Sequence, residues 1–181
     1  SEVEEAEKEV REIMKELDKL LEDSKRESDD IRRDLDRVLE ENKRHVDKSV
    51  TDLERVLSRG LDEEAVRELL RRAREDNRRN KEHVDRLVKK AKDKLDEHKK
   101  KVDDIIEKAR RELKRLEDEI GDDKELRRIL RELEEVIKRV ERTLREDHKE
   151  LKRVIDRMKE DLERSHEEHE RLVEEVERKL R

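Results

Sequence analysis

The chain has 181 residues, of which 61% are charged, 29% are hydrophobic and none is aromatic. Its 58 acidic and 52 basic residues are finely mixed and leave a net charge of −6, so the basic patch and stacking aromatics of a nucleic-acid-binding surface are missing. The absence of cysteine excludes disulfides and thiolate chemistry, and apolar runs of at most two residues predict neither a signal peptide nor a membrane span.

Three helices are predicted, because only Gly60 and Gly121 interrupt a chain that contains no proline. The first helix is expected over about residues 2–58, the second over about 63–119 and the third over about 123–180. Each glycine follows a predicted helix end, where a residue in the left-handed conformation commonly terminates a helix.

Helix-start signals accompany each predicted beginning. Ser1 with Glu4 has the spacing of a capping box, in which a side-chain oxygen accepts a hydrogen bond from a free backbone N–H. Asp62 is the expected N-cap of the second helix. Asp122 with Glu125 predicts a capping box at the start of the third helix.

The inward-facing residues of each helix recur with an 18-residue period, built from steps of 4, 3, 4, 3 and 4 residues. The period is marked by Ala6, Ser24 and Asn42, by Ala73, Ala91 and Ala109, and by Leu126, Leu144, Leu162 and Leu180. Eighteen residues in five turns is the 3.6-residue repeat of a straight helix, whereas a strict heptad would impose a left-handed supercoil. A disordered chain or an isolated exposed helix would show no such long-range order. The predicted fold is therefore all-α, an up-down-up antiparallel three-helix bundle of long, nearly straight helices, with residues 1–181 forming a single bundle.

Eleven polar residues interrupt or adjoin the inward-facing positions. They are Ser24, Ser28, Asn42, His45, Ser49, Asn77, Asn80, His98, His148, His166 and His169. Short connections place residue i of the first helix near residue 120 − i of the second, and residue j of the second near 243 − j of the third. Under this register, polar residues from all three helices lie at matched heights. His83, the sixth histidine, is expected at the rim.

Two polar layers are predicted from these heights. One surrounds Ser24, His98 and His148. The other is a double layer of Asn42, His45, Asn77, Asn80, His166 and His169, in which asparagines are the expected partners of His166 and His169. An unpartnered buried polar group costs about 1–3 kcal/mol, so matched layers penalise bundles in which one helix has slid by a repeat.

The combination of idealised helices, very short loops, a Glu/Lys/Arg surface, an aliphatic core and Asn/Ser/His layers resembles de novo designed helical bundles with buried hydrogen-bond networks. The histidine content is similar to that of pH-responsive designs of this class. The resemblance covers the whole chain and implies a structural scaffold with no natural biochemical function, in which acid breaks the network. The chain departs from designs assembled from two-helix subunits, so subunit dissociation is not implied.

The histidines leave two interpretations open, because the same residues serve as neutral network members and as a proton switch. A third interpretation, a Zn²⁺ or Ni²⁺ site formed by His166, His169 and His45, is less favoured. The segment "H-E-E-H" at 166–169 lacks the spacing of H-E-x-x-H, and no inward carboxylate completes a ligand set. No metal or cofactor is therefore predicted.

No catalytic residues are predicted, because the chain has no glycine-rich loop and adjacent helical residues such as Ser165 and His166 diverge by about 100°. We expect a non-enzymatic, soluble monomer that requires no partner, has no natural location and would remain in the cytoplasm of a recombinant host. The alternative is a subunit of a designed hetero- or homo-oligomer, a binding module whose polar layers face a partner chain.

Overall fold

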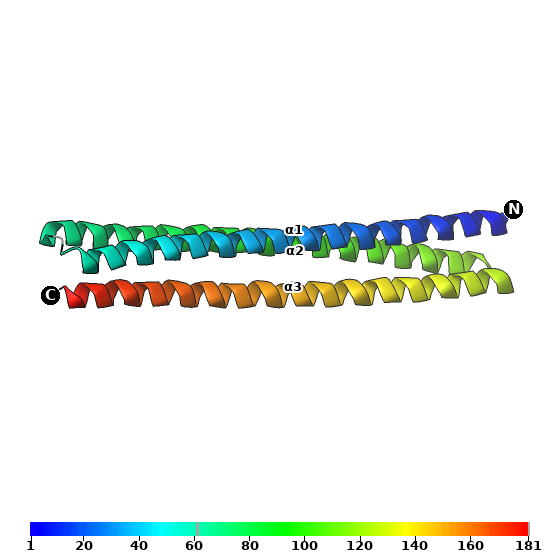
Figure 1. The fold of residues 1–181 in the computed structure, drawn as a ribbon. Helices are drawn as coiled ribbons and strands as arrows, with labels where there is room; N and C mark the ends of the chain where they lie inside the picture. Colours follow the sequence, from blue (N-terminus) through cyan, green and yellow to red (C-terminus); the bar gives the residue numbers. More distant parts are fainter. Residues whose placement is uncertain (61, 181) are drawn as a thin grey trace. The chain divides into compact units, whose positions relative to one another are not determined.

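The computed structural model describes residues 1–60 and 62–180, and the regular secondary structure of these residues is entirely α-helical. Helix α1 spans Glu2–Ser58, α2 spans Glu63–Glu119 and α3 spans Lys124–Lys179 (Figure 1). The helix ends differ from the predicted ones by at most one residue.

The three helices pack in two compact units, each of which contains a segment of every helix. Unit 1 comprises Ser1–Ile31 and Asp93–Lys152, and unit 2 comprises Arg32–Lys92 and Arg153–Arg181. Within each unit the segments form an up-down-up three-helix bundle, so the predicted fold class is confirmed. A single bundle over residues 1–181 stays a prediction.

Contacts in unit 1 give the direction of the first two helices. Arg115 Nη2 of α2 lies 2.7 Å from a carboxylate oxygen of Glu9 in α1, and His98 of α2 contacts Ser24 of α1. Residue numbers therefore rise along α1 while they fall along α2, which is the antiparallel arrangement that a short connection requires.

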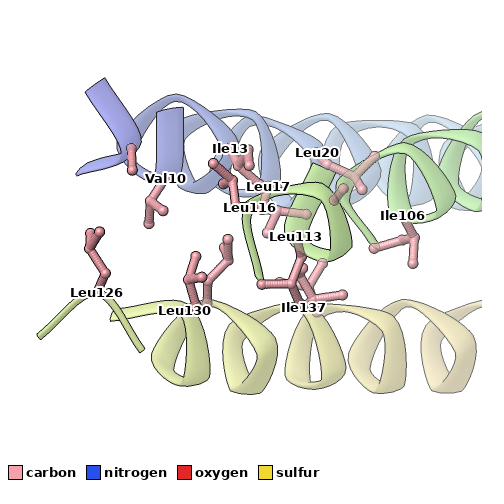
Figure 2. Packing of buried hydrophobic residues seen from close by; sticks show 14 of the residues in the cluster. Val10, Ile13, Leu17, Leu20, Ile106, Leu113, Leu116, Leu126, Leu130 and Ile137 are labelled. Atoms are coloured by element: carbon pink, nitrogen blue, oxygen red, sulfur yellow. The ribbon is translucent and has the colours of Figure 1, made fainter. Parts of the chain in front are cut away.

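The apolar core of unit 1 comes from all three helices, and Figure 2 shows their side chains converging. The labelled residues are Val10, Ile13, Leu17, Leu20, Ile106, Leu113, Leu116, Leu126, Leu130 and Ile137. Leu17 and Leu133 are 0% exposed. Unit 2 has a smaller cluster near the Gly60 turn, formed by Leu53, Val56, Val66, Leu70, Val173 and Val176. The 3.6-residue spacing of these residues places them on one face of each helix.

One marker of the 18-residue period does not belong to the core. Leu180 is 41% exposed, whereas Leu126, Leu144 and Leu162 are buried. Leu180 follows the last residue of α3 and therefore has no continuing helix to hold it against a neighbour.

Two of the predicted N-caps are confirmed. The Ser1 hydroxyl accepts a hydrogen bond from the Glu4 backbone N–H at 3.3 Å. The Asp62 carboxylate accepts one from the Ala65 N–H at 2.8 Å. Both bonds partner a donor of the first turn that has no acceptor within the helix.

The predicted cap of the third helix is wrong by one residue. Asp123, not Asp122, accepts hydrogen bonds from the backbone N–H groups of Glu125 at 3.0 Å and Leu126 at 3.1 Å. The Asp122 carboxylate instead binds Arg127 at 3.0 Å. Since α3 begins at Lys124, Asp123 is the residue immediately before the helix, and the predicted box of Asp122 with Glu125 does not form.

Both helix connections use a left-handed glycine, as expected. Gly60 has φ of 56° and Gly121 has φ of 61°, and no other described residue has a positive φ. An added Cβ would meet no atom within 4 Å at either position, so the requirement for glycine there is conformational and not steric.

The corrected cap gives a paired prediction. Asp123→Ala is expected to lower the free energy of unfolding by about 1 kcal/mol, because the first turn of α3 loses its side-chain acceptor. Asp122→Ala removes only an exposed ion pair and is expected to change it by less than about 0.5 kcal/mol. Urea unfolding of both variants measures the difference, and equal effects would contradict the assignment of the cap.

Candidate functional site: two buried polar layers

The polar layer of unit 1 centres on a hydrogen bond between α1 and α2. His98 Nε2 lies 2.8 Å from the hydroxyl oxygen of Ser24, which is only 5% exposed. Ser28 and His148 lie on the wall of the same groove, which has a volume of about 550 Å³. The structure therefore gathers Ser24, Ser28, His98 and His148 at one height, two residues from the predicted register for the Ser24–His98 pair.

Both histidines of this layer are held toward the neutral form. Burial lowers the pKa of His98, against the opposing effect of the Glu27 carboxylate. Burial also lowers the pKa of His148, and the ammonium group of Lys99 lowers it further. A buried imidazolium loses hydration, which is why burial favours the neutral ring.

The first part of the unit 2 layer links all three helices through amides and a hydroxyl. Asn80 Nδ2 of α2 donates to Asn42 Oδ1 of α1 at 2.9 Å, and Asn42 Nδ2 donates to the Ser165 hydroxyl of α3 at 3.1 Å. All three residues are half-buried. Each bond therefore joins residues of two different helices that are far apart in sequence.

Ser165 is a layer residue that the sequence reasoning missed. The sequence pattern predicts His166, and not Ser165, at this height. The signal was available, because the two register relations together place residue i of the first helix level with residue 123 + i of the third. Asn42 then lies level with residue 165, as observed.

The second part of the layer contains the buried histidines. His169 is 3% exposed, and its Nε2 is hydrogen-bonded to the Ser49 hydroxyl. Asn77, which is also 3% exposed, acts on His45 to raise its pKa. The rings of His45 and His169 have centroids 5.6 Å apart and an interplanar angle of 36°.

His166 lies in the same unit but differs from the expectation. Its side chain is 15% exposed, and its Nε2 lies 3.0 Å from a carboxylate oxygen of Glu170, one turn further along α3. The expected asparagine partners of His166 and His169 are therefore replaced by Glu170 and Ser49.

Three ring nitrogens in unit 2 are buried without a hydrogen-bond partner: His45 Nε2, His166 Nδ1 and His169 Nδ1. Burial lowers the pKa of His45, and the Asp76 carboxylate opposes this effect. Burial lowers the pKa of His169 as well, and the neighbouring rings of His45 and His166 act in the same direction. A neutral imidazole carries one nitrogen without a proton, so an unpartnered nitrogen is least costly in the neutral form.

His83 lies at the rim, as expected. Its side chain is 49% exposed, and Nε2 lies 2.8 Å from a carboxylate oxygen of Glu41. It takes no part in the buried layers.

Neither a metal site nor a membrane-spanning helix is found among the described residues. Within residues 1–60 and 62–180, no group of three or more histidine, aspartate or glutamate side chains is arranged to hold a metal ion, and His45, His166 and His169 do not form one. In the same residues, none of the helices combines the length and apolar character needed to cross a membrane.

The similarity of this chain to known proteins is limited. No protein-family model and no curated protein matches it. Among solved structures it is similar to one described as "Computationally designed three helix bundle", with a TM-score of 0.44 and 20% sequence identity over 98% of this chain and 90% of that chain. The fold and the layers described above rest on the geometry of this chain alone.

Proposed function

We propose that the chain is a designed structural scaffold that folds as a monomer. Its polar layers set the register of the helices and make the folded state sensitive to acid. The observation that carries the proposal is the buried hydrogen-bonded set in each unit that joins side chains of different helices, such as Asn80, Asn42 and Ser165. Six absent residue types and an 18-residue period in every helix support a designed origin. The proposal includes no catalytic role and no cofactor.

The register role follows from the repeat itself. Helices with an 18-residue period could slide by one period and still bury aliphatic residues. Such a slide would move Asn42 and Asn80 away from their partners, and a half-buried amide left without a partner costs at most about 1–3 kcal/mol. The layers therefore favour one register over alternatives of similar apolar burial.

Acid sensitivity follows from the histidines. Burial lowers the folded-state pKa of His45, His98, His148 and His169 below the unfolded value of about 6.5. As the pH falls through that value, the unfolded chain binds more protons than the folded chain does. The free energy of unfolding therefore decreases on acidification, and the stabilisation is fully present only above about pH 6.5.

Urea unfolding at several pH values tests this proposal. The midpoint is expected to decrease between pH 7.5 and pH 5, before most carboxylates titrate at about pH 4. An unchanged midpoint over that window would exclude acid sensitivity. Light scattering at both ends of the window is expected to give the monomer mass of 22.2 kDa, and a larger mass at pH 7.5 would favour an oligomer.

A further inference from the structure

The two polar layers differ in whether the buried ring nitrogens of their histidines have hydrogen-bond partners. The three buried ring nitrogens without a partner all belong to unit 2. In unit 1, His98 and His148 line a groove of about 550 Å³, and no buried ring nitrogen in the described part of this unit lacks a partner. A protonated ring is therefore left with an unpaired buried donor in unit 2 and not in unit 1.

Protonation in unit 2 creates donors that have no acceptor. An imidazolium carries N–H groups on both ring nitrogens, so a protonated His45 has a buried donor without an acceptor at Nε2, and a protonated His169 has one at Nδ1. The ring centroids of His45 and His169 are 5.6 Å apart, so two charges there would also repel each other. The unpaired donors and the charge repulsion therefore both destabilise the packing around His45 and His169.

Charged groups around His45 do not compensate a positive ring. The groove between α1 and α2 beside His45 is lined by Lys48 and Asp52 of α1 and by Arg72, Asp76, Arg79 and His83 of α2. Basic groups outnumber the two carboxylates there, before any histidine is protonated. Asp76 and the Asn77 side chain both act to raise the pKa of His45, against the larger effect of burial.

The groups around His166 are more balanced, but they lie toward solvent. The groove beside His166 is lined by Arg74, Arg78, Lys81, Glu82 and Asp85 of α2 and by Glu170 and Glu174 of α3. Glu170 is the carboxylate that contacts His166, and it also opposes the lowering of the pKa of His169. Glu170 bonds the exposed side of His166 and leaves its buried Nδ1 without a partner.

Among the described residues, few buried apolar side chains hold the part of unit 2 between this layer and the Gly60 turn. They form the six-residue cluster that includes Leu53, Leu70 and Val173, with Leu69, Ala73 and Leu172 packed against it. Loss of the layer would separate this cluster from the rest of the unit 2 packing, and a small cluster offers little burial of its own.

We infer that unit 2 opens locally at mildly acidic pH: the layer around His45, His166 and His169 separates, and the cluster between it and the Gly60 turn loses its packing while unit 1 stays folded. This inference rests on the proposed acid sensitivity and adds its location. The apolar residues between this layer and the Gly60 turn are therefore packed at neutral pH and exposed at mildly acidic pH.

Hydrogen–deuterium exchange of the full chain at pH 7.4 and pH 5.5, corrected for the intrinsic pH dependence of exchange, tests the inference. Peptides covering residues 45–58, 63–78 and 166–179 are expected to lose protection by at least about tenfold at pH 5.5. Peptides covering residues 10–24 and 126–144 of unit 1 are expected to keep theirs.

Two variants act as a matched pair. His98→Asn with His148→Asn is expected to retain the local loss of protection, and His45→Asn with His166→Asn and His169→Asn is expected to abolish it. The wild-type exchange pattern decides the matter even if the triple variant does not fold. Simultaneous loss of protection in all peptides, or earlier loss in unit 1, would overturn the inference while leaving acid sensitivity intact. An unfolding midpoint that does not change with pH would instead contradict the acid sensitivity in the proposed function.

Discussion

A variant with asparagine at positions 45, 98, 148 and 169 is expected to lose most of the pH dependence of stability. Each of these histidines, of which His169 is buried and the other three are half-buried, can remove at most about 1.4 kcal/mol of unfolding free energy for each pH unit below about 6.5. Four such histidines set an upper bound of about 5–6 kcal/mol at pH 5.5. Solvent in the groove beside His98 and His148 reduces their share, so we expect the wild-type protein to lose about 2–4 kcal/mol between pH 7.5 and pH 5.5.

The measured quantity is the difference in unfolding free energy between the two pH values, from urea titrations of the variant and the wild-type protein. This difference is informative even if asparagine itself changes stability, because asparagine does not titrate. His83→Asn is the matched control, since its ring is half exposed at the rim, and it is expected to keep the wild-type pH dependence. A fourfold variant with an undiminished dependence would show that other groups cause the response.

Replacement of Leu133 by alanine is expected to cost about 2–5 kcal/mol of unfolding free energy at neutral pH. Leu133 is 0% exposed within the core of unit 1, so the deletion leaves a cavity that neighbouring side chains from three helices fill only partly. This loss is comparable to a substantial part of the total stability of a typical domain.

Two neighbouring substitutions separate cavity formation from other effects. Glu132→Ala changes an exposed residue on the same helix and is expected to alter stability by less than about 0.5 kcal/mol. Leu133→Met nearly preserves the side-chain volume and is expected to cost less than about 1.5 kcal/mol. A cost below about 1 kcal/mol for Leu133→Ala would mean that the core of unit 1 is not packed as described.

The helices and the heights of the polar residues could be predicted because both depend on periodicity and on the places where a helix must stop. Two glycines in an otherwise helix-forming chain defined the turns, and the steps along each helix defined its inner face. The register needed only the positions of those turns, and it placed Ser24 with His98 and Asn42 with Asn80 to within two residues.

The individual partners could not be predicted in the same way, because they depend on side-chain direction at a scale below one helical turn. Asp122 and Asp123 are equally good capping residues, and the backbone after Gly121 selects the second. His166 takes Glu170 on its own helix because that carboxylate is one turn away, which no register relation between helices describes. The pairing of Ser165 with Asn42 follows only from the combined register of α1 and α3. The register between successive helices favours the neighbouring His166 at this height.

The 18-residue period has a consequence for length. Because eighteen residues complete five turns, inserting one period into each helix returns every following residue to the face it already occupies. Such an insertion would add about 27 Å to each helix at 1.5 Å per residue. The two left-handed glycine turns would not need to change. Helix length can therefore be altered in steps of 18 residues without moving any polar residue to another face of its helix.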